Sequence, residues 1–358
     1  MRRLGLAYRG DATADTGQDK MTGKDNGEYR NKVVAQSVAG RPPEDDEGKT
    51  EPLPLRPEWK VLEPDDRTDP VPHEIYDLKK LENGWTVAAA SVRGKLHAHR
   101  GLWRDDAYAF DETGHWTIIA VSDGAGCAKW SRIGARIACD ESVRAMKEML
   151  SGFTFQGQSK VDTPSEADFR RLKAFLTLGA CTARDEIVRE AHTRGISTDE
   201  MYATLLLAVH GPWKDKDAVG ALQVGDGAIG VFMGDGRCTE LWSPDTCGRS
   251  AAFLNLWSEI TRRPYDQRIL FAVKRDIRYI AVMSDGVADD FFPLEKRLAE
   301  LLAGNSIGQL RAKDGGPVNG VLREILRNPQ DSKALQSWLG YAAKGSRDDR
   351  TLVLLYRH

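Results

Sequence analysis

The sequence has few cysteines, no long apolar run and almost no net charge. Its five cysteines include no CxxC pair and show no disulfide-like spacing, so we expect reduced thiols in a cytosolic protein. The longest wholly apolar runs are about as long as residues 205–209, far short of the roughly 18 residues that would suggest a membrane span.

The charge and composition exclude further classes of partner. A formal net charge of -2 on 358 residues gives no electrostatic basis for binding nucleic acid or an anionic membrane. With 41% hydrophobic and 29% charged residues, the composition is that of an ordinary soluble protein. Acidic and Gly-rich sequence follows Arg2 and Arg3 where a signal peptide would have an apolar segment, so we expect a cytoplasmic location.

Composition divides the chain near residue 82. Residues 1–82 are rich in Asp, Gly, Lys, Pro and Thr and show no sustained period, which predicts a flexible or disordered N-terminal arm. Residues 59–62 are either an isolated apolar spot in this arm or a segment that docks on the folded body or on a partner. The folded domain is predicted over residues 83–358.

Strand and helix patterns follow one another in blocks. Strands are predicted at 85–92, 107–110, 116–121, 202–209, 218–224, 228–233, 278–283 and 352–356. Helices are predicted at 133–150, 166–192, 294–302, 321–326 and 332–343. This segregated order favours an α+β fold in which helices cover sheets.

Two apolar runs of strand length end in the same tripeptide. Residues 117–124 and 279–286 both finish in Ser-Asp-Gly, so each delivers an aspartate to the end of a buried strand. A third acidic group, Asp348 and Asp349, precedes the last apolar run. Buried carboxylates are costly without a compensating cation, and oxygen-only ligands select Mg²⁺ or Mn²⁺. The alternative to a metal site is that each Asp-Gly is only a turn.

Two other Asp-Gly steps are less informative. Residues 225–230 formally match the dinucleotide fingerprint GxGxxG, but a second strand follows where that motif needs a helix. We therefore predict a hairpin there, with Asp226 structural, and a second hairpin turn at Asp235.

A mixed-charge segment lies at residues 93–107. It contains His97, His99, several arginines and the acidic pair Asp105 and Asp106. By itself this pattern is typical of a solvated loop. Beside a metal site, the same residues offer cations for a phosphate and carboxylates for metal-bound water.

Four motifs together resemble a known family. Asp106, Ser122-Asp123-Gly124, Ser284-Asp285-Gly286 with Asp289, and Asp348-Asp349 with Thr351 resemble, in this order, the metal-dependent protein phosphatases of type 2C. Ser-Val-Arg-Gly at 91–94 and Ser-Asp-Gly-Ala-Gly at 122–126 resemble the bacterial branch. The resemblance implies a four-layer α-β-β-α sandwich of two antiparallel sheets flanked by helices. It also implies a binuclear Mg²⁺ or Mn²⁺ centre at one end of the sheets.

The resemblance also implies roles for individual residues. Asp123 would bridge both ions, the carbonyl of Gly124 would bind the second, and Asp285 and Asp348 would complete the first. The remaining roles are Asp105 and Asp106 as holders of metal-bound water, Asp199 as a ligand of a third ion, and Asp289 and Asp349 as groups that orient ligands.

Two residues usual in the family are missing. Ala125 stands where many relatives have a histidine, and Gly101 stands where the phosphate-binding arginine is common. The candidates to replace them are His97, His99, Arg100 and Arg104, of which His97 aligns best with the bacterial branch. The predicted catalytic set is Asp123, Asp285, His97 and Arg100.

The resemblance thus predicts a serine/threonine phosphoprotein phosphatase that hydrolyses phosphomonoesters by a water activated between two Mg²⁺ or Mn²⁺ ions. Its partner would be a phosphorylated protein in a signalling pathway, opposed by a Ser/Thr kinase, and we expect a monomer. The alternatives are a catalytically weak or inactive scaffold that binds phosphorylated partners, and a phosphatase for small phosphorylated metabolites.

Overall fold

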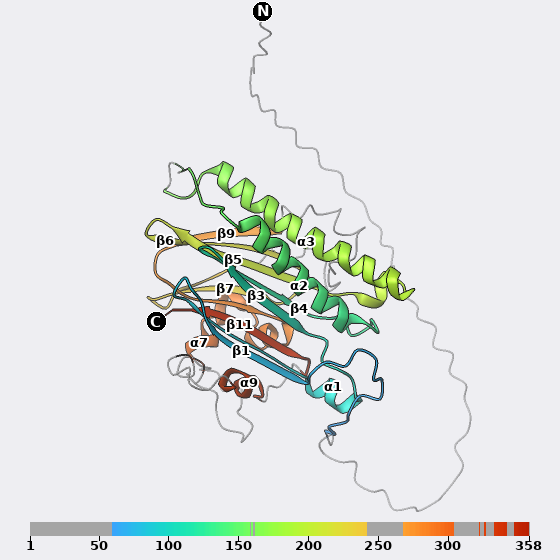
Figure 1. Ribbon diagram of the computed structural model, residues 1–358. Coiled ribbons are helices and arrows are strands. Elements are labelled where there is room, and N and C mark those ends of the chain that lie inside the picture. The colour runs from blue at the N-terminus through green and yellow to red at the C-terminus, as the bar shows by residue number, and fades with distance from the viewer. Residues whose placement is uncertain are drawn as a thin grey trace, which may run out of the picture. The chain divides into compact units, whose positions relative to one another are not determined.

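Two antiparallel β-sheets pack face to face between two layers of helices in the computed structural model (Figure 1). The structure describes residues 59–157, 159, 162–241, 268–303, 322, 326, 333–341 and 347–357. All of them belong to one unit, Arg56–His358. The arrangement confirms the predicted α+β, four-layer α-β-β-α sandwich.

The first sheet has six strands in the order β1-β2-β11-β10-β7-β8. They are β1 (Glu74–Lys80), β2 (Thr86–Val92), β11 (Arg350–Tyr356), β10 (Ile277–Met283), β7 (Ala228–Met233) and β8 (Cys238–Glu240). The last strand of the chain lies inside this sheet, where Val353 pairs with Ala89 on one side and Val282 on the other. Strands from both ends of the folded unit are therefore neighbours.

The second sheet has five strands in the order β3-β4-β5-β6-β9. They are β3 (Ala107–Thr113), β4 (Trp116–Ser122), β5 (Leu205–Trp213), β6 (Lys216–Val224) and β9 (Ile269–Lys274). Every residue of β4 is buried because the strand is covered on both faces. Ile118 and Ala120 face the helices, and Ile119 and Val121 face the other sheet, which explains the continuous apolar run.

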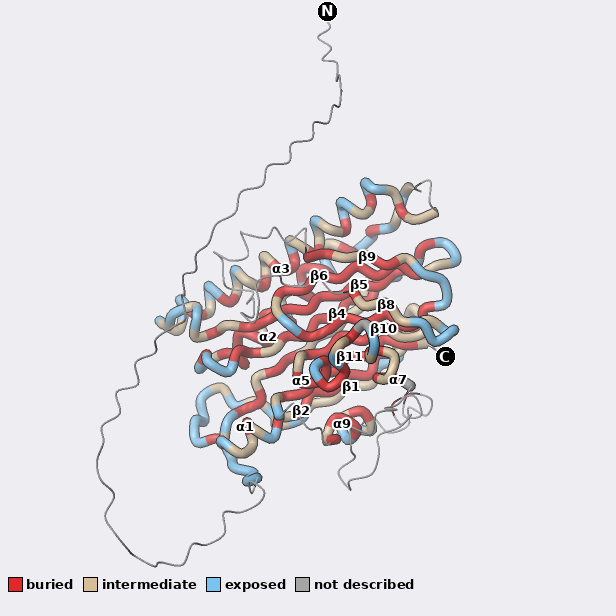
Figure 2. Tube along the Cα trace, turned by 180° about the vertical axis from the view of Figure 1, so that it is seen from behind, coloured by how far each residue is buried: buried red, intermediate tan, exposed pale blue. Residues whose placement is uncertain are grey.

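Two long helices lie side by side over the five-stranded sheet, α2 (Ser131–Leu150) and α3 (Glu166–Arg194) (Figure 1). Helix α3 begins at a capping box between Ser165 and Asp168 and ends at Gly195, whose φ of 66° is left-handed. The outer face of the six-stranded sheet carries α5 (Asp285–Ala288), η3 (Asp289–Phe291), α6 (Leu294–Arg297), α7 (Glu300–Ala303) and α9 (Ala334–Leu339). Figure 2 shows buried residues concentrated in the strands of both sheets.

Several predicted boundaries change. Strand β1 lies within residues assigned to the N-terminal arm, so the folded unit begins before residue 83; residues 1–58 lie outside the described part. Its sequence, EIYDLKK, hid this edge strand because most of its side chains face solvent. Residues 95–100, predicted as part of a loop, form α1 (Lys95–Arg100). The predicted helix 294–302 is split into α6 and α7, and helices 321–326 and 332–343 fall partly outside the described residues.

The predicted hairpin at residues 225–230 is wrong. Strand β6 belongs to the five-stranded sheet and β7 to the six-stranded sheet, so the turn crosses between sheets. No helix follows it, which agrees with the rejection of a dinucleotide site. The hairpin at Asp235 is confirmed, because β7 pairs with β8 and the Met233 N–H donates to the Arg237 carbonyl.

Neither the thiols nor the helices of the described part conflict with the expectations from composition. Cys127 is exposed, Cys139 is buried, and these two with Cys181 and Cys238 are free thiols; Cys247 lies outside the described residues. Across the same residues, no helix combines the length and apolar character needed to cross a membrane.

A close approach between helix and backbone gives a stability prediction. A Cβ added at Gly134 of α2 would lie 2.2 Å from the Met201 carbonyl oxygen in η1 (Thr198–Met201). Gly134→Ala gains about 1 kcal/mol of helix propensity, but the clash with fixed backbone costs about 1–3 kcal/mol or more. We expect the free energy of unfolding in urea to fall by about 1–2 kcal/mol. Gly126→Ala, which meets nothing within 4 Å, is the control and should change it by less than about 0.5 kcal/mol.

Candidate metal centre

Three aspartates converge where the two sheets end. Asp123 follows β4, Asp226 lies in the turn between β6 and β7, and Asp285 follows β10 at the start of α5. One carboxylate oxygen from each lies within 4.8 Å of the others. We call Asp123, Asp226 and Asp285 the carboxylate cluster. Its members come from both sheets, so the packing of the sheets brings them together.

The first Ser-Asp-Gly is held by Thr204. The Ser122 hydroxyl donates to the Thr204 carbonyl at 2.6 Å, and the Asp123 N–H donates to the Thr204 hydroxyl oxygen at 2.8 Å. The Thr204 N–H donates back to the Asp123 carbonyl at 2.8 Å. These bonds fix the backbone of Asp123 and leave its carboxylate for the cluster.

The second Ser-Asp-Gly uses its serine to hold another carboxylate. The Ser284 hydroxyl donates to Asp106 Oδ2 at 2.8 Å, and the Thr351 hydroxyl donates to the same oxygen at 2.7 Å. The Thr351 N–H donates to the Ser284 hydroxyl oxygen at 3.0 Å. The other oxygen, Asp106 Oδ1, is buried and has no hydrogen-bond partner among the described residues.

Crowding of carboxylates changes their acidity. Burial, and then the charges of Asp106 and Asp285, raise the pKa of Asp123 well above its usual range. Burial and the charge of Asp226 raise the pKa of Asp285 to about 8, and burial and the charge of Asp349 raise the pKa of Asp106 to about 6. Each negative charge therefore disfavours the others.

This donor set fits hard divalent cations. All three members of the carboxylate cluster offer oxygen atoms, and Asp106 keeps one buried oxygen without a partner. A cation of charge two would offset the repulsion that raises the pKa of these groups. Oxygen-only ligands favour Mg²⁺ or Mn²⁺ over zinc or copper.

A second group joins α1 to the start of β11. It consists of His97, Asp348 and Asp349, whose ligand atoms also lie within 4.8 Å of one another. Asp349 is 1% exposed and accepts hydrogen bonds from the Gly94 N–H at 2.6 Å, the Asp105 N–H at 2.5 Å and His97 Nδ1 at 3.0 Å. Asp349 thus fastens both ends of the segment that carries α1.

The acidic neighbours of His97 favour its protonated form. Burial lowers the pKa of His97, but the hydrogen bond that His97 donates to Asp349 and the charges of Asp349, Asp105 and Asp348 outweigh it and raise the pKa to about 9. His97 Nε2 lies 3.8 Å from the half-exposed Asp348 carboxylate. The imidazolium therefore offsets negative charge beside Asp348 and Asp349.

Two glycines allow the backbone around Asp348 and Asp349 to close. A Cβ at Gly94 would lie 2.3 Å from the Asp348 carbonyl carbon. A Cβ at Gly286 would lie 1.9 Å from the Asp349 carbonyl oxygen. A larger residue at Gly94 would therefore clash with the Asp348 backbone, and a larger residue at Gly286 would clash with the Asp349 backbone.

The structure brings some predicted metal ligands together and separates others. Asp123 and Asp285 share the carboxylate cluster, whereas Asp348 lies with His97. The charge of Asp348 nevertheless contributes to the raised pKa values of Asp123 and Asp285. Burial, and then the charge of Asp349, raise the pKa of Asp105 to about 7. Gly124 is buried and bridges to Ala203.

Asp199 is exposed on η1 and belongs to neither acidic group of the described residues. Asp289 is exposed in η3, and partial desolvation of its carboxyl with the charge of Asp226 raises its pKa. Neither position tests the role that the resemblance implied for these residues.

The candidates for the missing arginine and histidine differ in their surroundings. Arg104 is buried and donates to the Ser91 hydroxyl at 2.7 Å and the Pro72 carbonyl at 3.1 Å. His99 Nδ1 accepts from the Lys60 N–H at 3.2 Å, and its ring meets the Trp59 ring. Arg100 is exposed at the end of α1. Residues 59–62 thus dock on the folded unit, one of the alternatives left open by the sequence.

Sequence reasoning missed the position of Asp226. It assigned this residue to a hairpin turn, but the turn links two sheets and places the carboxylate beside Asp123 and Asp285. Asp226 shares its Gly-Asp-Gly sequence with the Asp235 turn, whereas Asp123 and Asp285 share Ser-Asp-Gly, so the local sequence did not single out Asp226.

The chain matches one described family of proteins. A family described as protein phosphatase 2C matches residues 93–327, a stretch that includes Asp105, Asp123, Asp226 and Asp285. A search of curated protein sequences gives no match.

Solved structures similar to this chain include bacterial phosphatases. A bacterial serine phosphatase is 12% identical, covering 76% of this chain and 97% of its own, with a TM-score of 0.45. The serine/threonine phosphatase PstP/Ppp of Mycobacterium tuberculosis is 16% identical, with coverages of 75% and 97% and a TM-score of 0.41. The serine/threonine phosphatase Stp1 of Staphylococcus aureus is 11% identical, with coverages of 84% and 99% and a TM-score of 0.40.

Asp226 and Asp235 form a matched pair for testing the cluster. Both follow a glycine and precede one, but Asp235 lies in the exposed β7–β8 turn and pairs with Arg237. We expect Asp226→Asn to weaken Mn²⁺ binding at least about 10-fold, because the cluster loses a charged donor. Asp235→Asn should leave the dissociation constant unchanged. Isothermal titration with Mn²⁺ measures both; equal affinities in the two variants would remove Asp226 from the metal site.

The raised pKa values predict how stability depends on pH. With EDTA present, the folded state binds more protons than the unfolded state from about pH 4 to about pH 8, because the pKa of Asp285 rises from 3.8 to about 8. The free energy of unfolding should therefore fall as the pH rises through this window, and the Tm should fall by about 2–4 °C per kcal/mol lost. Calorimetry at pH 5.5 and 8.0 measures the change.

Two controls isolate the carboxylate cluster in that experiment. Asp285→Asn should reduce the decrease in Tm, and saturating Mn²⁺ should largely abolish it. Asp235→Asn should retain the full decrease, because Arg237 and the nearby backbone hold the pKa of Asp235 below its usual range. A Tm that rises from pH 5.5 to 8.0 in EDTA would contradict the electrostatic account.

Proposed function

This chain belongs to the protein phosphatase 2C family, and we propose that it hydrolyses phosphoserine and phosphothreonine in proteins at the carboxylate cluster. The family match confirms the resemblance drawn from the sequence and the assignment as a metal-dependent protein-serine/threonine phosphatase. The observation that carries the proposed site is the convergence of Asp123, Asp226 and Asp285 at the end of the two sheets, where burial and then the neighbouring carboxylates raise the pKa values of Asp123 and Asp285.

The residues that would hold two Mg²⁺ or Mn²⁺ ions are Asp123, Asp226, Asp285, the Gly124 carbonyl and Asp348. When bound, such ions neutralise charge on phosphoryl oxygens and lower the pKa of a bound water. Asp199 remains the candidate for a third ion. The inclusion of Asp226 rests on its distance from Asp123 and Asp285, and that of Asp348 on family resemblance and on its charge, which raises the pKa of both.

Asp106 is suited to orient the attacking water. Ser284 and Thr351 both donate to its Oδ2, so Oδ1 is the oxygen that could accept a hydrogen bond from the water. Asp105 precedes it in the chain, and burial with the charge of Asp349 raises the pKa of that carboxyl while no cation is bound. Direct attack by water needs no protein nucleophile, so the exposed thiol of Cys127 has no required role.

His97 acts in this proposal as a positioning residue. It donates to Asp349, and Asp349 holds the Asp105 N–H, so the imidazolium is linked to Asp105 through one carboxylate. Arg100 is the exposed cation proposed to meet the phosphate in place of the family's usual arginine. The proposed partner is a phosphorylated protein, opposed by a Ser/Thr kinase.

Metal-dependent hydrolysis tests this function. We expect the chain to hydrolyse p-nitrophenyl phosphate and a phosphothreonine peptide with Mn²⁺ or Mg²⁺, and to lose activity in EDTA. Asp123→Asn should reduce kcat/KM at least about 100-fold, a loss typical of removing one group that stabilises the transition state. Asp235→Asn is the matched control and should retain full activity.

The alternative function has a distinct outcome. Wild-type protein that binds Mn²⁺ and a phosphopeptide but hydrolyses neither substrate would contradict the enzyme proposal and favour a phosphopeptide-binding scaffold. Hydrolysis of p-nitrophenyl phosphate without EDTA sensitivity would instead contradict the metal-dependent mechanism.

A further inference from the structure

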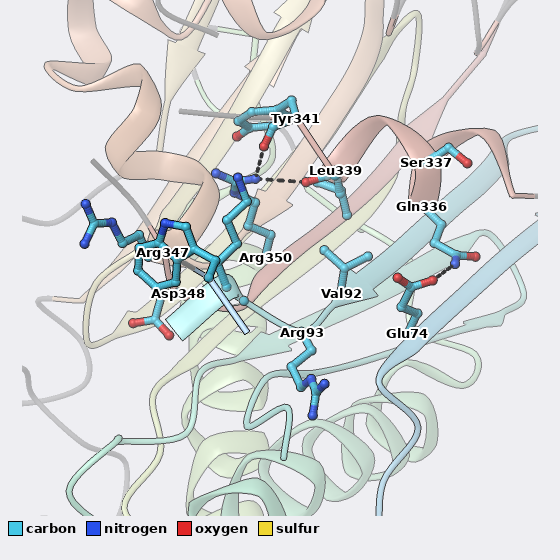
Figure 3. A pocket seen from close by; sticks show the side chains of 14 residues that line it. Glu74, Val92, Arg93, Gln336, Ser337, Leu339, Tyr341, Arg347, Asp348 and Arg350 are labelled. Atoms are coloured by element: carbon cyan, nitrogen blue, oxygen red, sulfur yellow. Dashed lines mark hydrogen bonds between the residues drawn. The ribbon is translucent and has the colours of Figure 1, made fainter. Parts of the chain in front are cut away.

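A cavity of about 400 Å³ adjoins Asp348 (Figure 3). Its charged lining consists of Arg93, Lys95, Arg347 and Arg350 against Glu74 and Asp348. Positive groups therefore outnumber negative ones in a chain whose net charge is -2. Figure 3 shows Arg347 and Asp348 on one side of the cavity and Glu74 with Gln336 on the opposite side.

Two of these cations are engaged in holding the fold. Arg350 is buried and donates to the Tyr341 carbonyl at 2.6 Å and the Leu339 carbonyl at 3.0 Å. Arg93 donates to the Leu102 carbonyl at 3.2 Å. Their positive charge contributes to the field of the cavity, but both guanidinium groups also have structural partners.

The other two cations face the cavity without a carboxylate partner. Lys95 and Arg347 are both exposed, and neither forms an ion pair with a described residue. The Arg347 guanidinium lies 4.7 Å from the centre of the Trp59 ring, which also lines the cavity. This contact holds Arg347 beside an aromatic wall and leaves its hydrogen-bond donors for an incoming group.

The cavity lies next to the proposed catalytic residues. Arg347 precedes Asp348 directly, and Lys95 follows Gly94, whose backbone packs on Asp348. An extended peptide advances about 3.3–3.6 Å per residue, so a side chain only a few residues from the phosphorylated one can reach a neighbouring cavity. Its size, about 400 Å³, is within the range of ligand pockets and sufficient for a carboxylate or phosphate side chain.

We propose that Lys95 and Arg347 bind an anionic side chain that flanks the phosphorylated residue of the protein substrate. The chemistry recognised is a carboxylate or a second phosphate, with Trp59 covering its apolar stem. The proposal rests on the proposed function and adds a substrate preference to it. Only a peptide substrate carries such a flanking side chain, so the cavity affects the binding of peptides and not of a small phosphate ester.

The binding of paired peptides tests this preference. A fluorescein-labelled peptide with a non-hydrolysable phosphothreonine mimic is made with Glu, Gln or an equally non-hydrolysable phosphoserine mimic at the flanking positions, on either side. Dissociation constants come from anisotropy with Mn²⁺ present. We expect wild-type protein to bind a Glu or phosphoserine peptide about 5-fold or more tightly than the Gln peptide, a gain available from two partly exposed ion pairs.

Matched variants locate the effect. Lys95→Gln with Arg347→Gln should abolish the preference, whereas Lys80→Gln with Arg170→Gln, which removes two exposed cations elsewhere, should retain it. Lys95→Glu with Arg347→Glu should reverse it toward Lys-flanked peptides, which a purely structural defect would not do. Hydrolysis of p-nitrophenyl phosphate should be unchanged in all of them. A larger gain from phosphoserine than from Glu assigns the cavity to a second phosphate, and equal gains assign it to anions in general.

The outcomes separate this inference from the proposed function. If p-nitrophenyl phosphate is hydrolysed and wild-type protein binds the Glu, phosphoserine and Gln peptides equally, the cavity proposal is overturned and the phosphatase assignment stands. If neither p-nitrophenyl phosphate nor the phosphothreonine peptide is hydrolysed but the anionic peptides still bind more tightly, the function fails and the cavity remains an anion site. A preference that persists in Lys95→Gln with Arg347→Gln overturns the residue assignment.

Discussion

Mutual repulsion among carboxylates at one end of the sandwich is the constraint on which the rest of this structure depends. Asp123, Asp226 and Asp285 approach within 4.8 Å, and Asp106 lies behind them with one unsatisfied buried oxygen. The hydroxyls of Ser284 and Thr351 hold the Asp106 carboxylate, and Thr204 holds the backbone of Asp123. The fold thus keeps a local excess of negative charge, and a divalent cation is the partner of matching charge and chemistry.

Asp349 holds the segment from Gly94 to Asp105, which carries α1. Its carboxylate accepts from Gly94, His97 and Asp105, which lie far from it in the sequence. Because β11 pairs with β2 inside the six-stranded sheet, the same strand pairing that closes the fold also places Asp349 beside α1.

Much of the fold and part of the site could be predicted from the sequence. The buried strands were recognisable as apolar runs, and the repeated Ser-Asp-Gly identified Asp123 and Asp285, which the structure brings together. Strand β1 was missed because an edge strand carries charged side chains and has no clear apolar period. Helix α1 was missed because six residues are too short for a helical pattern, and its position depends on contacts with Asp349.

Asp226 could not be assigned without knowing the sheet topology. A Gly-Asp-Gly between two strands has the same local sequence whether the strands pair or belong to different sheets, and only the second arrangement brings Asp226 to the cluster. The separation of Asp348 from that cluster is likewise a long-range outcome, because it follows from the contacts of Gly94 and His97.

Anomalous diffraction from crystals soaked in Mn²⁺ would test the central claim most directly, because it locates the cation without requiring turnover. The account predicts strong peaks about 2.0–2.4 Å from the carboxylate oxygens of Asp123, Asp226 and Asp285. A soak in saturating Mn²⁺ that gives no peak at these residues, or a peak only at His97, Asp348 and Asp349, would contradict it.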